Sequence, residues 1–146
     1  MANPETILAV GRLTTEGPWV GLRRSADRWD LVFGEADGSV ALPRPAGPPD
    51  RIGLVAAAIA YFSEALADPP PAYEATQADL AALIRWLAET EPDPMVAARL
   101  GEALDAIDDG LPGDAVAGRL TDVIAHEQVD PIDLLVQIHG ALQARR

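Results

Sequence analysis

The sequence predicts an α+β fold: an N-terminal antiparallel β-meander of three or four strands, followed by a bundle of about five helices. Residues 1–43 alternate short runs of β-forming residues with turns rich in Gly, Pro and Asp. Residues 50–146 instead repeat apolar residues at the spacing of amphipathic helices, separated by breaks that contain Pro or Gly. The length of 146 residues fits a single domain, with 1–43 as its sheet and 50–146 as its helical part.

The strands are expected at 5–13, 19–24, 29–34 and 39–42. In the third of these, Trp29, Leu31 and Phe33 alternate with other residues, which places them on one face of the sheet. The pair Asp37-Gly38 before the last strand favours a hairpin turn, because Gly adopts a positive φ at little cost.

A proline-rich connector, residues 43–49, separates the sheet from the helices. Asp50 then caps a helix whose run 52–62 is apolar on nearly every side, which predicts a central helix that packs on the sheet. That run is eleven residues long, and a membrane span needs about 20. The residues expected to be mutually buried between this helix and the sheet are Leu31, Phe33, Ile59 and Phe62.

Capping signals mark the later helices. Thr76 followed by Asp79 resembles a capping box, and Asp130 before Pro131 is an N-cap followed by Pro at the first helical position. The stripes expected to face inward are Leu80, Leu83, Ile84 and Leu87; Val96, Leu100, Leu104 and Ile107; Val116, Leu120, Val123 and Ile124; and Leu134, Leu135, Ile138 and Leu142.

The chain is strongly acidic, with 23 acidic residues against 11 Arg, no Lys and a net charge of −12. Residues 1–49 carry −1, whereas the 17 acids and 6 Arg of residues 50–146 leave −11. A field of that sign repels phosphate, so we expect binding neither to nucleic acid nor to an anionic membrane. The absence of Cys and of a recognisable signal peptide predicts a cytoplasmic location.

Chemistry at neutral pH could come from His126 or His139. His126 follows Asp122 by four residues, the spacing of an exposed helix pair, and His139 borders an apolar stripe. The chain has three Ser, none in a G-x-S-x-G elbow, and it has no Gly-rich phosphate loop. The sequence therefore predicts no catalytic set and no cofactor.

The turn between Asp105 and Asp114 is rich in carboxylates, which also include Asp108 and Asp109. Its spacing does not match a calcium-binding loop, which needs acids at positions 1, 3 and 5 and a Glu at position 12. Helix capping and solvation explain the same residues, so we expect no metal here.

Two surfaces are candidates for partner binding. Because short connectors alternate between the two ends of a bundle, one end should hold Glu89, Glu91, Asp93, Glu127, Asp130 and Asp133. The opposite end should hold Asp68, Glu74, Asp105, Asp108, Asp109 and Asp114, and acidic rims of this kind steer a basic partner. In the sheet, Trp19 and Arg23 point away from the face of Val20 and Leu22, and an outward Trp beside an Arg has the composition of an interface anchor. A Trp19 that is covered by the N-terminal segment fits the same pattern. The expected partner-binding residues are Trp19, Arg23, Glu89, Glu91, Asp93, Glu127, Asp130 and Asp133.

These observations together predict a non-catalytic protein-interaction domain, such as an adaptor, an inhibitor or an immunity-type protein, whose acidic surface binds a basic protein partner. The alternative is a small enzyme, or a ligand- or metal-binding module, that uses His139 or the Asp105–Asp114 turn.

Overall fold

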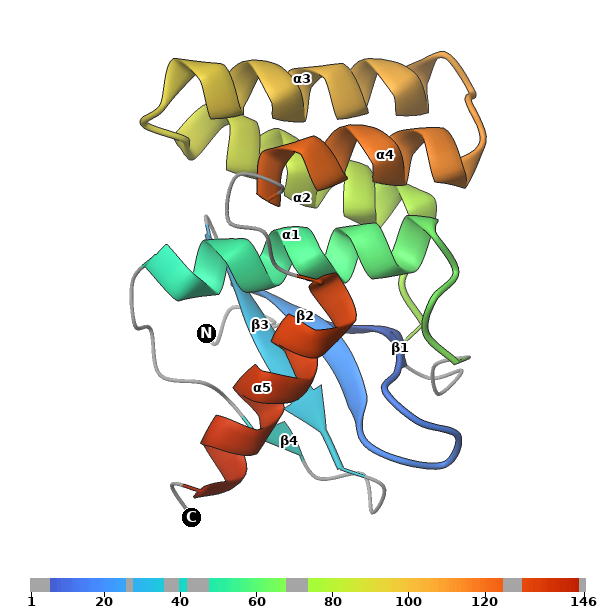
Figure 1. Ribbon diagram of the computed structural model, residues 1–146, viewed down its shortest axis with the longest axis vertical. Helices are drawn as coiled ribbons and strands as arrows, with labels where there is room; N and C mark the ends of the chain where they lie inside the picture. Colours follow the sequence, from blue (N-terminus) through green and yellow to red (C-terminus); the bar gives the residue numbers. More distant parts are fainter. Residues whose placement is uncertain are drawn as a thin grey trace, which may run out of the picture.

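The computed structural model describes residues 6–25, 28–35, 40–41, 48–67, 74–124 and 130–144. Its first third is an antiparallel sheet with the strand order β1-β2-β3-β4 (Figure 1). The strands are β1 (Thr6–Arg12), β2 (Trp19–Ser25), β3 (Arg28–Gly34) and the two-residue β4 (Val40–Ala41). The predicted order of an antiparallel meander followed by helices is confirmed.

Five helices follow within the described residues: α1 (Pro48–Phe62), α2 (Gln77–Thr90), α3 (Pro94–Asp108), α4 (Gly113–Ile124) and α5 (Pro131–Ala144). α1 packs on the sheet, and α2, α3 and α4 stack on the side of α1 that faces away from it (Figure 1). α5 leaves this stack and packs against α1 beside the sheet. Among the described helices, none has the length and apolar character to cross a membrane.

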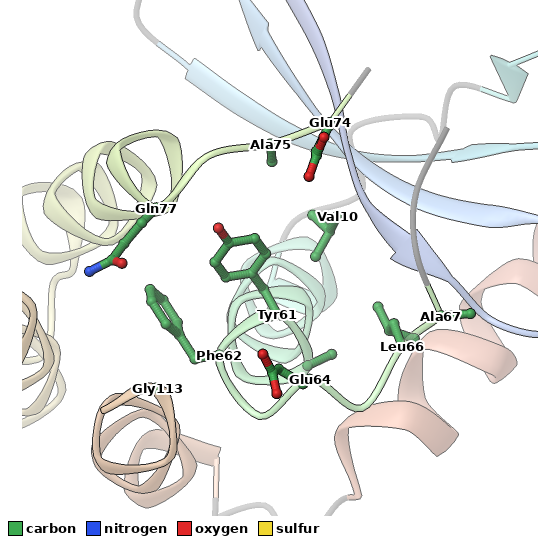
Figure 2. A pocket seen from close by; sticks show the side chains of 11 residues that line it. Val10, Tyr61, Phe62, Glu64, Leu66, Ala67, Glu74, Ala75, Gln77 and Gly113 are labelled. Atoms are coloured by element: carbon green, nitrogen blue, oxygen red, sulfur yellow. The ribbon is translucent and has the colours of Figure 1, made fainter. Parts of the chain in front are cut away.

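The sheet has an inner face covered by helices and an outer face with its own small cluster. Leu31, Phe33, Ile59 and Phe62 are all buried in the main core, as predicted, although Phe62 points toward the starts of α2 and α4 and not toward the sheet (Figure 2). The outer face carries Ala9, Trp19 and Val32, with Ile7 packed against them. The alternation of β2 and β3 thus separates two apolar surfaces with the expected period of two.

Helix starts agree with the capping signals at two positions and differ at one. Thr76 and Asp79 form a capping box, with backbone N–H to side-chain oxygen distances of 2.8 and 3.2 Å. Asp130 accepts hydrogen bonds from the backbone N–H groups of Ile132 and Asp133. Asp50 lies inside α1 instead of capping it, because the preceding prolines suit the first helical turn and let the helix begin at Pro48.

The inward face of α3 is also different from the prediction. Leu100, Ala103 and Ala106 are buried, whereas Leu104 and Ile107 are only partly buried. The buried stripe of α3 is therefore made of one leucine and two alanines, with the larger Leu104 and Ile107 at its margin.

The free edge of β1 is covered by two short segments of the chain. Arg12 and Ala67 exchange backbone hydrogen bonds of 2.8 and 3.1 Å, and the Ala75 N–H donates to the Ala9 carbonyl at 2.9 Å. A Cβ at Gly11 would meet the Ala67 carbonyl oxygen at 2.8 Å, so only Gly permits this approach. The segments that flank residues 68–73 are therefore fixed to the sheet.

Some predicted features lie outside the described residues. They are the Asp37-Gly38 turn, most of the 43–49 connector, Asp68, His126 and Glu127. The side chains of Ile124 and Leu142 also lie outside the description.

Candidate functional site

Trp19 lies on the predicted outer face of the sheet, but it is not exposed. Its side chain is only 2% accessible, and it packs with Ala9 and Val32. A Cβ built at Gly34 or Gly21 would overlap its indole ring, so the ring lies directly over these two glycines. Of the two alternatives for Trp19, the exposed anchor is wrong, since a surface anchor needs a side chain that a partner can reach. The covered Trp is what the structure has, with Ala9 and Ile7 of β1 in the same cluster.

Arg23, the second residue of that expected surface, is engaged within the sheet. It faces Asp30 across the β2–β3 pair, and its Nη2 donates to Oδ2 of Asp30 at 2.6 Å. Arg28 donates to the other carboxylate oxygen at 3.1 Å. Asp30 is the one charged residue in the described chain that is buried, at 6% exposure. Arg23 thus compensates a buried carboxylate, and this role explains its position.

The acids at the α2–α3 turn are partly used in holding the fold. Arg51 at the start of α1 lies 3.4 Å from the carboxylate of Glu91 and donates to the Leu87 carbonyl at 2.7 Å. Asp93 caps α3 by accepting the N–H two residues later at 2.9 Å. Of the three predicted acids, Glu89 is the one left as an ordinary exposed side chain. This turn has little uncommitted carboxylate to offer a partner.

Asp130 and Asp133 lie at the start of α5, away from the α2–α3 turn. Figure 1 shows α5 beginning beside the middle of α1, and not at the bundle end where α2 joins α3. These acids would share one end only if every short connector alternated between the two ends of one bundle. Since α5 leaves the bundle to cover the sheet, the expected single acidic end that unites these residues is not formed.

The acids predicted for the opposite end of the bundle lie together there, as far as the described residues go. The C-terminal end of α1, the start of α2 and the α3–α4 turn lie together there (Figure 1). The α3–α4 turn and its flanking helix ends carry four exposed acids: Asp105, Asp108, Asp109 and Asp114. We call the region formed by these four acids, Glu64 and Glu74 the acidic end.

A cavity of about 630 Å³ opens to solvent within the acidic end. Its walls come from β1 (Val10), the C-terminal end of α1 with the following turn (60–67), residues 74–77 and the first residue of α4, Gly113 (Figure 2). The two segments fixed to the edge of β1 supply Ala67, Glu74 and Ala75, so the same backbone contacts that protect the sheet edge shape the cavity. A volume of this size is typical of ligand pockets.

Three ionisable side chains line this cavity: Tyr61, Glu64 and Glu74. Tyr61 projects into its middle, with Glu64 and Glu74 on opposite sides of the ring in Figure 2. Glu64 takes a positive φ of 53° where α1 ends, a conformation that favours Gly. Within the described residues, the carboxylates of Glu64 and Glu74 and the hydroxyl of Tyr61 make no hydrogen bond and no ion pair. Sequence reasoning missed this site because its residues follow no periodic pattern.

The phenol of Tyr61 is held in its neutral form. Burial raises its pKa above the ordinary value of 10.0, and the negative charges of Glu74 and Asp79 raise it further. The neutral phenol therefore stabilises the folded state fully below pH 10.0, and this contribution is lost as the pH rises through the folded-state pKa.

Replacing Glu74 with Gln should lower the pKa of Tyr61 toward 10.0, because it removes one of the negative charges that oppose ionisation. Ultraviolet titration of phenolate measures this, and the Tyr61→Phe variant identifies which signal belongs to Tyr61. Glu102→Gln is the control, since it removes the same charge from an exposed position on α3. A Tyr61 pKa unaffected by Glu74→Gln would contradict the arrangement around the ring.

His139 is fixed between α5 and the end of β3. Its Nε2 lies 3.4 Å from Oε1 of Glu35, and its ring centroid lies 5.2 Å from that of Phe33. The side chains of His139 and Glu35 are 12% and 18% exposed. This leaves little imidazole surface for a substrate, and the pair joins α5 to the sheet.

No group of three potential metal ligands occurs among the residues that the structure describes, including the Asp105–Asp114 turn. Comparison of the chain with protein-family models, with curated proteins and with solved structures finds no match.

Proposed function

We propose that this protein is a non-catalytic protein-interaction domain that binds a basic protein partner through the acidic end. The observation that carries the proposal is the uneven charge: −11 on residues 50–146 against −1 on residues 1–49. At the acidic end, carboxylates from α3, α4 and the segments that connect the helices stay exposed, whereas at the α2–α3 turn Glu91 pairs with Arg51 and Asp93 caps α3. Such a one-signed surface accelerates encounter with a partner of opposite charge.

The enclosed state of His139 supports the non-catalytic part of the proposal. A general base must come within hydrogen-bonding reach of a substrate proton. His139 instead packs on Phe33 and faces Glu35, where a substrate would have to displace part of the core.

Reversing the charge of three acids at the α3–α4 turn should slow association with the partner about tenfold or more. The variant is Asp105→Lys, Asp108→Lys and Asp109→Lys, measured as binding kinetics on a partner captured from the host lysate. These side chains are exposed near the C-terminal end of α3, where cations interact favourably with the helix dipole, so folding is expected to be intact. Salt should slow association by the native protein in the same direction, because exposed charges are screened over about 10 Å at 0.1 M.

The matched control reverses three exposed acids elsewhere: Glu89→Lys, Glu102→Lys and Asp122→Lys. Its net charge equals that of the first variant, so the comparison separates the location of charge from its amount. Glu102 gives up only a solvent-exposed contact with Arg99, which contributes little to stability. Equal slowing by both variants, or an association rate that does not respond to salt, would contradict the proposal.

A further inference from the structure

We infer that the cavity at the acidic end binds an arginine side chain of the protein partner, with Glu64 and Glu74 as its carboxylate ligands and Tyr61 as its aromatic platform. The inference rests on the proposed function, because it assigns the partner group that the acidic end recognises.

The described lining of the cavity is negatively charged. Two of the cavity's lining residues are glutamates, and none of its lining residues in the described chain is basic. Glu64 and Glu74 form no ion pair within the described structure, in contrast to Glu91, which is paired with Arg51. Two uncompensated carboxylates that face one concave space favour a cation in that space, since the field is focused by the protein walls around it.

The lining also favours one form of cation. Two carboxylates and an aromatic ring that line the same cavity suit a group that can donate several hydrogen bonds while it covers the ring. A guanidinium is planar, has five N–H donors and stacks on aromatic rings, whereas an ammonium is a compact point charge. Tyr61 supplies the ring, and its hydroxyl adds an acceptor within the same space.

The surroundings of the cavity favour a cation that belongs to a protein. The nearby start of α2 does not favour an anion, because the capping box engages the N–H groups of Thr76 and Asp79 and places the Asp79 carboxylate there. The cavity opens to solvent beside exposed acids of the α3–α4 turn, which lie outside its walls. A protein surface can place one arginine in the cavity and further basic residues against those acids, whereas a small free amine can use the cavity alone.

The test is an amide-resolved NMR titration of the full chain with N-acetyl-arginine amide, beside its neutral isostere N-acetyl-citrulline amide. For a probe of this size, binding in the millimolar range is expected. We expect saturable shifts at residues 60–67 and 74–77 with the arginine probe and none with citrulline. Equal shifts with citrulline, or shifts confined to other residues, would overturn the inference. Binding of spermidine at these residues without binding of the arginine probe would also overturn it.

The variants Glu64→Gln and Glu74→Gln should each weaken binding of the arginine probe at least tenfold, because they keep the shape of the side chain and remove its charge. Both residues are exposed, so the amide spectra should show an intact fold. Glu102→Gln, which makes the same charge change on α3, should leave the affinity unchanged. Unchanged affinity in the two cavity variants would contradict the assignment.

The same variants separate this inference from the proposed function. A captured partner whose association depends on salt and on the α3–α4 acids, but not on Glu64 or Glu74, would retain the proposed function and overturn the arginine site. Saturable binding of the arginine probe to a protein whose association with basic proteins ignores salt and charge reversal would support the site and contradict the wider function.

Discussion

Replacing Trp19 with Ala should lower the free energy of unfolding by about 3–5 kcal/mol, the range for removing a large buried aromatic side chain. The indole is 2% exposed and lies over Gly21 and Gly34 on the outer face of the sheet. With Trp19 gone, these two glycines have no side chain to fill the space, so the cavity would persist or be filled by water. Urea denaturation followed by circular dichroism measures the change.

Trp19→Phe is the matched comparison, because it keeps an aromatic ring over the two glycines and should recover a large part of the loss. A change of less than about 0.5 kcal/mol in Trp19→Ala is typical of a surface residue and would show that the indole is not a core side chain. The experiment therefore separates a structural Trp from an interface anchor, and the structure favours the former.

Much of the fold follows from local patterns in the sequence. The period of two in residues 19–34 identifies both the strands and their faces, and the capping residues Thr76 and Asp130 locate two helix starts. The four apolar residues predicted to face inward from α2, from Leu80 to Leu87, are its buried residues. These features depend on interactions within a few residues, which are visible in the sequence itself.

Burial of the outer face could not be predicted in that way. The alternation places Trp19 and Arg23 on one side of the sheet, but it does not show what lies over that side. A Trp whose opposing positions on the same face are Gly21 and Gly34 can lie flat on the sheet. The glycines were therefore the available signal that this Trp packs inward on its own sheet and is not projected toward a partner.

The candidate site depends on contacts between distant parts of the chain. Glu64 and Glu74 face one cavity because residues 67 and 75 each pair with β1, more than fifty residues earlier in the sequence. Likewise, Glu91 and Asp130 would lie at one end of the bundle only if α5 continued the bundle. Connector length constrains which helices are neighbours, but it does not determine when a helix leaves the stack to cover the sheet.

Replacing Asp30 with Ala should lower the free energy of unfolding by about 3 kcal/mol, because it leaves the guanidinium of Arg23 without its carboxylate partner. The side chains of Arg23 and Asp30 are 16% and 8% exposed, so the loss belongs at the lower end of the range for buried pairs. The Nε of Arg23 is already buried without a hydrogen bond in the described structure, so Asp30 provides an important part of its compensation. Chemical denaturation measures the change.

A second variant distinguishes the lost pair from lost packing. Arg23→Met combined with Asp30→Leu removes both charges from the outer face, which already carries the apolar residues Ile7 and Val32. Because replacement of a buried pair by apolar residues of similar volume is often close to neutral, the double variant should be more stable than Asp30→Ala alone. If the double variant were no more stable than the single one, the cost would come from the shape of the Asp30 position and not from an uncompensated charge. The ion pair between Arg23 and Asp30 would then contribute little to the stability of the fold.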